Sequence, residues 1–386
     1  MKDYLSAVIT EQKNRGLYLK QMIPNPLQYP ELSGLAVSCG RIIDENIKYL
    51  EFLQSEIKSQ HSEDFRSILR GIRACTRDLE LVESYGITPL NYQPEEKEYL
   101  NRLVFKIHQE INYPLPHPAV ACISTQYYFF SPFTNVIFIP FGESEFLLHL
   151  PDMFHELGHG IYLKRENELR LSELNQKYNL IINEITEHYQ KLLSEAKRET
   201  GPKSRIFLIK LMHSNWKNWI DEFLCDLFAL FTLGPAYVYT HLHLATKTSK
   251  DIYKFSSMIP QTHPSDDSRM KMLMIGLKLI GLDAEIDDVS SKWHAMPFVS
   301  GLHPSSDYYY AYPKTLMEKV ASLLLQGLKE TNFPIMTRAV LKNLEHRSVR
   351  RLLNEAWDKF WENPNKYREW ELDRIKKLRQ NYYFIS

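Results

Sequence analysis

Two histidines four residues apart are the first feature of this chain with the type and spacing for chemistry. His155 and His159 belong to the run HELGH, in which Glu156 follows the first histidine. On an α-helix, residues four apart lie on one face, so both imidazoles can converge on one ion while Glu156 projects beside it toward a bound water. The alternative is an ordinary helix with two partly buried histidines bonded to neighbours. The spacing favours a zinc site in which these two histidines supply two of the protein ligands.

A carboxylate farther along the chain can complete that site. A catalytic zinc has three protein ligands and an open fourth position, and a carboxylate is a common third ligand after two histidines. Glu222 is the best candidate, because Asp226 lies one helical turn beyond it and can accept the second imidazole N–H of a zinc histidine. Apolar residues surround both acids, namely Phe223, Leu224, Leu227, Phe228 and Leu230. A buried carboxylate needs a partner, which favours ligation over a solvent-facing acidic turn.

These two motifs resemble those of the gluzincin metallopeptidases, which combine HExxH with a downstream ExxxD. A third element, THPSDDSRM with His263 and Arg269, is similar to the histidine-proline and arginine element of the M48 family. The resemblance implies that His263 lies beside the substrate and helps to stabilise the oxyanion, while Arg269 has a supporting role. It covers three short motifs between Phe154 and Met270.

Other residues are alternative candidates for the side chain that stabilises the oxyanion. His303 begins a second His-Pro-Ser run, and a tyrosine cluster follows at 308–312. Zincins often use a phenol or an imidazole to hydrogen-bond the tetrahedral intermediate, although core packing is the commoner reason for such a cluster. His263 can also be read as a residue before a helix that Ser265 or Asp266 caps. The sequence leaves these alternatives open.

The expected fold class is α+β, mainly α. Residues 1–112 form a helical N-terminal region, in which Ile43, Ile47 and Leu50 show helical spacing. Two β-rich runs at 119–130 and 134–140 predict a small, mostly antiparallel sheet before the active-site helix, which packs against it. The second run resembles the edge strand along which zincins hold an extended substrate.

The remaining chain completes a zincin-like catalytic domain at 113–300 and a helical C-terminal region at 301–386. Residues 165–200 predict a long amphipathic helix, which we interpret as a solvated arm. Glu184 and Glu187, two rival ligands, lie on this arm and are expected in solvent. The helix that carries Glu222 and Asp226 is expected to end at Gly234-Pro235.

Composition excludes several classes of protein. Among 386 residues, 47 lysines and arginines balance 47 aspartates and glutamates, so nothing indicates a nucleic-acid binder or a polybasic anchor. Four cysteines without a CxxC pair are typical of free thiols in a reducing compartment. We find no signal peptide and no apolar run long enough to span a membrane. A soluble, cytoplasmic protein is expected, of unknown oligomeric state.

The sequence therefore predicts a zinc-dependent metallopeptidase that acts on a peptide or protein substrate. In this hypothesis Zn²⁺ polarises a water and the scissile carbonyl, Glu156 transfers the water's proton to the leaving amine, and His263 or a tyrosine stabilises the oxyanion. One alternative is a zinc hydrolase of a non-peptide amide or ester, which differs only in pocket shape. Another is a regulatory binding protein with a structural zinc, which would not need Glu156 as a general base.

Overall fold

The computed structural model describes residues 2–24, 30–59, 65–91, 98–124, 127–140, 143–198, 203–249, 251–300 and 303–384. Over these ranges the chain is mainly helical and contains one three-stranded sheet, which confirms the expected mainly α composition. Its contacts divide it into two compact units. Unit 1 comprises Met1–Lys106, Pro116–Ser144 and Leu378–Phe384, and unit 2 consists chiefly of Ile107–Leu115 and Glu145–Lys377.

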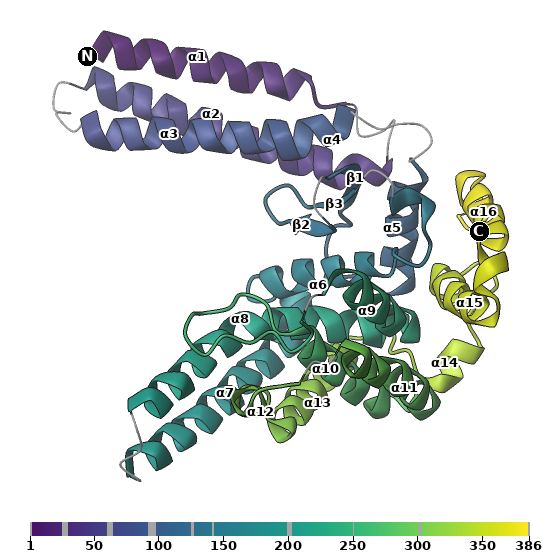
Figure 1. Ribbon diagram of the computed structural model, residues 1–386. Coiled ribbons are helices and arrows are strands. Elements are labelled where there is room, and N and C mark those ends of the chain that lie inside the picture. The colour runs from purple at the N-terminus through teal and green to yellow at the C-terminus, as the bar shows by residue number, and fades with distance from the viewer. Residues whose placement is uncertain are drawn as a thin grey trace. The chain divides into compact units, whose positions relative to one another are not determined.

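In unit 1, three long helices lie side by side (Figure 1). The helices of this part of the chain are α1 Lys2–Gln21, α2 Ser33–Lys58, α3 Phe65–Val82, α4 Thr88–Asn91 and α5 Tyr99–Glu110, with a 3-10 turn at Pro30–Leu32 and a π-helical turn at Glu83–Ile87. The apolar stripe expected along α2 is confirmed, because Ile43, Leu50 and Leu53 are buried. They pack against α1 and α3.

The sheet of unit 1 is mixed, not mostly antiparallel. Its strands are β1 Ala119–Ser124, β2 Phe129–Ser131 and β3 Val136–Pro140, in the order β1-β3-β2. β2 and β3 pair antiparallel as a short hairpin, whereas β1 and β3 pair parallel from Ala119 opposite Val136. The expected run at 119–130 is thus two strands, with 125–126 outside the described residues. Alternation of side chains carries no information on strand direction, which explains the error.

Unit 2 is built around α8, Lys203–Leu233, a helix of 31 residues. α6, Asp152–Lys164, packs against it, and so does α10, Asp266–Leu279. α8 ends as expected at Gly234, whose φ of 103° is in the region that favours glycine. The chain then turns into α9, Pro235–Thr248, which packs against α8.

The long amphipathic helix α7, Ser172–Arg198, does not form a solvated arm. Its apolar seam is buried against α8 and α13 at Leu174, Tyr178, Ile181, Ile185 and Tyr189. The Tyr189 hydroxyl donates to the carbonyl oxygen of Ala311 at 3.1 Å. The interpretation as an arm was wrong because the seam finds partners far away in sequence; residues 199–200 lie outside the described part. Glu184 pairs with Lys319 at 2.9 Å, and Glu187 is exposed.

The rest of unit 2 is helical, as expected for the C-terminal region. Its elements are α11 Asp283–Ser300, α12 Ser306–Ala311, α13 Lys314–Glu330, α14 Arg338–Lys342, α15 Val349–Glu362 and α16 Pro364–Arg379, with 3-10 turns at Glu143–Glu145 and Leu169–Leu171 elsewhere in the chain. Among the described residues, no helix is long and apolar enough to cross a membrane. All four cysteines are buried free thiols, as expected.

Candidate metal centre

Helix α6 carries the HELGH run, as expected. It begins after Pro151, and its apolar stripe of Phe154, Leu157 and Ile161 is buried. The same packing draws His155 and Glu156 into the interior, where they are only 7% and 5% exposed. The motif therefore lies on a helix whose polar groups are held away from bulk water, which strengthens electrostatic interactions among them.

Gly158 allows α6 to approach α8 closely. A Cβ atom at this position would lie 2.9 Å from Cα of Cys225 and 3.1 Å from its Cβ. Real Cβ atoms do not tolerate such a distance to backbone, so the helices would have to separate. Glycine within a helix costs about 1 kcal/mol relative to alanine. The close helix contact offsets that cost and brings the side chains of the two helices together.

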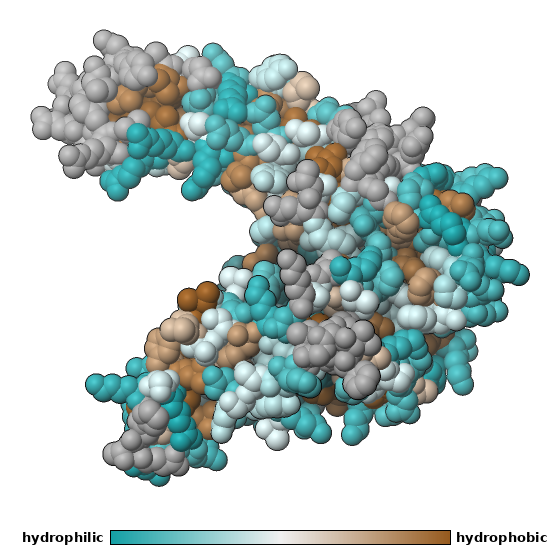
Figure 2. Space-filling model, in the orientation of Figure 1, coloured by the Kyte–Doolittle hydropathy of each residue, from teal (hydrophilic) through white to brown (hydrophobic). Residues whose placement is uncertain are grey.

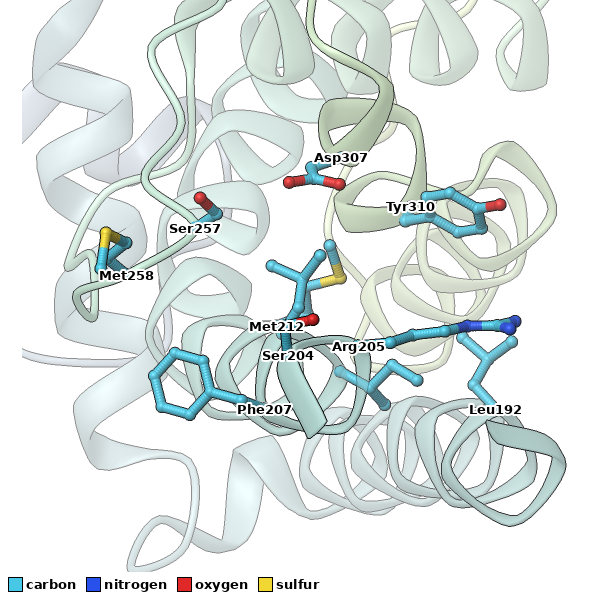
Figure 3. A pocket seen from close by; sticks show the side chains of 11 residues that line it. Leu192, Ser204, Arg205, Phe207, Met212, Ser257, Met258, Asp307 and Tyr310 are labelled. Atoms are coloured by element: carbon cyan, nitrogen blue, oxygen red, sulfur yellow. The ribbon is translucent and has the colours of Figure 1, made fainter. Parts of the chain in front are cut away.

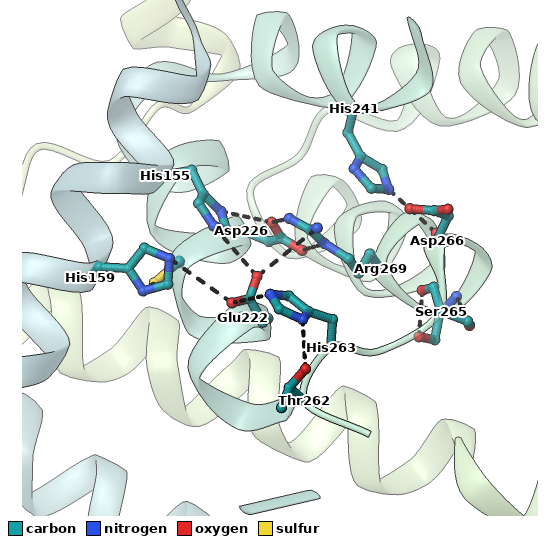
Figure 4. A network of polar contacts seen from close by, with 12 residues as sticks. His155, His159, Glu222, Asp226, His241, Thr262, His263, Ser265, Asp266 and Arg269 are labelled. Atoms are coloured by element: carbon teal, nitrogen blue, oxygen red, sulfur yellow. Dashed lines mark hydrogen bonds and ion pairs between the residues drawn. The ribbon is translucent and has the colours of Figure 1, made fainter. Parts of the chain in front are cut away.

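Both imidazoles face one carboxylate of α8 (Figure 4). Nε2 of His155 lies 3.6 Å from Oε2 of Glu222, and Nε2 of His159 lies 4.0 Å from Oε1. The Glu222 side chain is 13% exposed. The three residues expected to hold zinc are therefore brought together, with the same nitrogen of each histidine turned toward the acid.

Behind this group, Asp226 binds both the imidazole of His155 and a guanidinium. Its Oδ1 lies 3.0 Å from Nδ1 of His155. Arg269 donates from Nε to Oδ2 at 2.8 Å and from Nη2 to Oδ1 at 2.6 Å. Although burial alone would raise the pKa of Asp226, Arg269 holds that pKa well below its usual value. Asp226 and Arg269 thus occupy the positions expected of residues that support the ligands.

Tyr237 on α9 also belongs to this group, and the sequence analysis missed it. Its hydroxyl donates to Oδ1 of Asp226 at 2.5 Å and lies 2.9 Å from Nδ1 of His155. The available signal was the Gly234-Pro235 turn, which reverses the chain so that α9 packs on α8 near Asp226. A tyrosine soon after such a turn is within reach of the acid, but spacing alone does not reveal it.

The second histidine has a different neighbour. Sγ of Cys225 lies 3.3 Å from Nδ1 of His159. Burial and nearby carboxylates raise the pKa of Cys225 well above its usual value. Suitable ligand atoms of His155, His159 and Cys225 all lie within 4.8 Å of one another, so this trio could itself hold a metal ion.

His263 lies on the open side of the group. Its Nε2 is 3.7 Å from Oε1 of Glu222, and its side chain is 68% exposed. Ser265 caps α10, accepting from the backbone N–H of Ser268 at 3.1 Å, so the helix-start interpretation also holds. His303 is exposed, and no contact joins it to Glu222 within the described part of the chain.

The tyrosine cluster supports the segment that carries His263. The backbone N–H of Ser265 donates to the Tyr312 hydroxyl at 3.1 Å, and the Tyr308 hydroxyl donates to Asp267 at 2.6 Å. Both tyrosines are buried, whereas Tyr309 and Tyr310 are exposed. Tyr308 and Tyr312 therefore fix the start of α10, which follows His263 directly.

The titratable side chains of this group shift one another's pKa values. Burial lowers the pKa of His155, but its hydrogen bonds to Asp226 and Glu222 prevail and raise it to about 10. Burial and the charge of His155 lower the pKa of His159 to about 4. Burial opposes ionisation of Glu222, but His155 lowers its pKa to about 2.

The types of these residues suit a metal ion such as zinc. Ligand atoms about 2.1 Å from a tetrahedral zinc lie roughly 3.4 Å from one another. The separations between the histidine nitrogens and the nearest Glu222 oxygens, 3.6 and 4.0 Å, are near that value. The His155 nitrogen away from Glu222 is bonded by a carboxylate, the usual arrangement behind a metal-bound histidine.

Comparison of the chain with protein-family models, with curated proteins and with solved structures finds no match. The chemistry of these residues is therefore the basis for a functional proposal.

Proposed function

We propose that this chain is a zinc-dependent metallopeptidase with a zincin-like catalytic domain. The observation that supports it is the shared orientation of His155 and His159, whose Nε2 atoms both face Glu222, with Asp226 behind His155. Two histidines, a glutamate and a carboxylate behind one histidine are the groups that a catalytic zinc site with three protein ligands uses.

Glu222 is a better third ligand than Cys225. The sulfur faces Nδ1 of His159, whereas the Nε2 atoms of both histidines face Glu222 on the other side of that ring. A thiol must also lose its proton to bind zinc, and burial raises the pKa of Cys225 well above its usual value. With zinc on Nε2, the Nδ1–H of His159 donates to the sulfur and fixes the ring.

His155, His159 and Glu222 would hold the zinc, which supplies a water of lowered pKa and polarises a substrate carbonyl. Glu156 takes a proton from the attacking water and passes it to the nitrogen of the leaving amine. The imidazole of His263 stabilises the negative charge that develops on the substrate oxygen. We also propose that the protein is cytoplasmic, which its free thiols support.

Metal analysis and a peptide-cleavage assay test this proposal together. We expect about one zinc per wild-type chain, loss of zinc in Glu222→Ala, and retention in Glu187→Ala, an exposed acid on α7. Glu156→Gln should keep its zinc and lose cleavage of a peptide library by about 10²-fold or more, because only the proton transfer is removed.

Three results would contradict parts of the proposal. A wild-type chain that binds no zinc even when it is supplied would end the metal hypothesis. Normal cleavage by Glu156→Gln would show that Glu156 is not the general base. Zinc binding without cleavage of any peptide, combined with hydrolysis of amide or ester substrates, would favour the non-peptide hydrolase instead.

A further inference from the structure

A pocket of about 610 Å³ lies in unit 2, away from the histidines. It is formed by the end of α7, the first half of α8, α12 and the loop of residues 251–265. Phe207 and Met258 lie at one end of it, and Arg205 and Leu192 lie at the other, with Met212 between them (Figure 3). Most of these lining side chains are apolar. The volume of the pocket suits one or two large side chains of a ligand.

The pocket is bordered by apolar side chains that remain in solvent. Phe207 is 52% exposed, Met258 77% and Tyr310 58%. Ile259, next to Met258 in the chain, is 64% exposed. Figure 2 shows brown, hydrophobic surface over this part of α7, α8 and the loop. Clustered apolar exposure of this kind marks a binding surface more often than chance.

The exposure of Met258 is fixed by hydrogen bonds in its loop. The Ser256 hydroxyl accepts from the backbone N–H groups of Met258 and Ile259 at 3.3 and 3.2 Å. The backbone N–H of Gln261 donates to Oδ1 of Asn215 on α8 at 3.0 Å. The loop is therefore a hydrogen-bonded turn attached to α8, and Met258 and Ile259 are exposed on it.

Both α8 and the loop of residues 251–265 run from the pocket toward the candidate metal centre: α8 leads to Glu222 and the loop leads to His263. Along α8, ten residues separate Met212 from Glu222, which corresponds to about 15 Å at the helical rise. Along the loop, five residues separate Met258 from His263, which corresponds to at most about 17 Å of chain. An extended peptide covers such a distance with about four or five residues.

We infer that this pocket binds a large apolar side chain of a peptide substrate, about four or five residues from the bond that is cut. The inference rests on the proposed peptidase function and defines its substrate class. An extended polypeptide is the ligand that can occupy the pocket and reach Glu222 at once. Arg205 and Asp307 line the same pocket and can hydrogen-bond the peptide backbone beside the anchoring side chain.

Matched synthetic peptides test the inference. Each contains a sequence cut by the wild-type enzyme, with either leucine or serine five residues from the bond, in one series on its amino side and in another on its carboxyl side. A short peptide that ends before this position is the third substrate. In one series, we expect leucine to raise kcat/KM of the wild type by about tenfold or more over serine, the effect of burying one such side chain.

Phe207→Ser and Met258→Ser should abolish this preference for leucine and leave cleavage of the short peptide unchanged. Both side chains are substantially exposed, so these variants should fold normally. Leu169→Ser, at a residue 90% exposed on another part of unit 2, is the matched control and should keep the preference. Equal kcat/KM for leucine and serine peptides in both series, or a preference that survives in the pocket variants, would overturn this inference and leave the peptidase proposal standing. Failure of the wild type to cut any peptide would overturn both.

Discussion

The two histidines of the candidate centre have opposite surroundings. His155 belongs to an inner region with Asp226, Tyr237 and Arg269, in which the histidine side chain is 9% exposed and the aspartate is fully buried. His159 belongs to an outer region with Cys225 and His263, in which its own side chain is 24% exposed. The inner region is charged and densely hydrogen-bonded, whereas the outer region opens to solvent at His159 and His263.

This difference would suit the proposed metal, which places two requirements on the site. One part of the site must hold a ligand in a single orientation, and buried, charge-assisted hydrogen bonds do so. Another part must leave room for water and substrate. We therefore expect substitutions of the residues behind His155 to affect folding and metal affinity, and substitution of the exposed His263 to affect turnover.

Asp226→Ala should have the largest effect. It leaves the guanidinium of Arg269 buried without its carboxylate, a change that typically costs about 3–5 kcal/mol. We expect a loss of this size in the free energy of unfolding, measured by urea denaturation of the metal-free protein. Asp226→Asn keeps the shape and should lose less. A cost below about 1 kcal/mol for the alanine variant would mean that the inner region does not depend on this ion pair.

His263→Ala should lower kcat by about 10²-fold, the usual cost of losing one oxyanion donor. The side chain is 68% exposed, so zinc content and stability should be unchanged. His303→Ala is the control and should retain full activity. If His263→Ala lost zinc as well, the outer region would include a fourth ligand and the open position would have to lie elsewhere.

Tyr237→Phe removes one hydroxyl from the inner region and should weaken zinc binding by about tenfold. The loss arises because both His155 and Asp226 lose a hydrogen-bond partner. Competition with a chelator measures the affinity. Tyr239→Phe is a matched control on the same helix, because its hydroxyl donates to Asp288 at 2.7 Å, away from the histidines. Equal affinities in the two variants would show that Tyr237 does not orient His155.

Cys225→Ala should have the smallest effect, a decrease in zinc affinity of about threefold, because a thiol is a weak hydrogen-bonding group. Alanine keeps the Cβ atom and therefore the packing against Gly158. Cys75→Ala, at a buried cysteine in unit 1, controls for loss of any thiol. Complete loss of zinc in Cys225→Ala, with retention in Glu222→Ala, would identify the sulfur as the third ligand.

Features of the site that depend on the geometry of a single helix could be predicted from the spacing of residues in the sequence. The convergence of His155 and His159, and the placement of Asp226 one turn after Glu222, follow from helical geometry. Gly158, within HELGH, is a residue at which α8 comes close to α6, where a Cβ atom would lie 2.9 Å from Cα of Cys225. These features required only the residues themselves and the period of an α-helix.

Contacts between distant segments could not be predicted in this way. The parallel pairing of β1 with β3, the burial of the α7 seam and the position of Tyr237 all depend on where the chain returns in space. Cys225 was visible only as a free thiol, because its approach to His159 depends on the separation of α6 and α8. The pocket beside Phe207 joins four segments, none of which is distinctive alone.

The missing side chain at Gly158 has a consequence for how the centre responds to its surroundings. Ion pairs weaken in salt, and hydrogen bonds with titratable partners change with pH. The distance between α6 and α8 at Gly158 is limited instead by atoms in van der Waals contact, which neither salt nor pH alters. The distance between α6, which carries His155, and α8, which carries Glu222, should therefore stay the same when a change of salt or pH weakens the ion pairs around it.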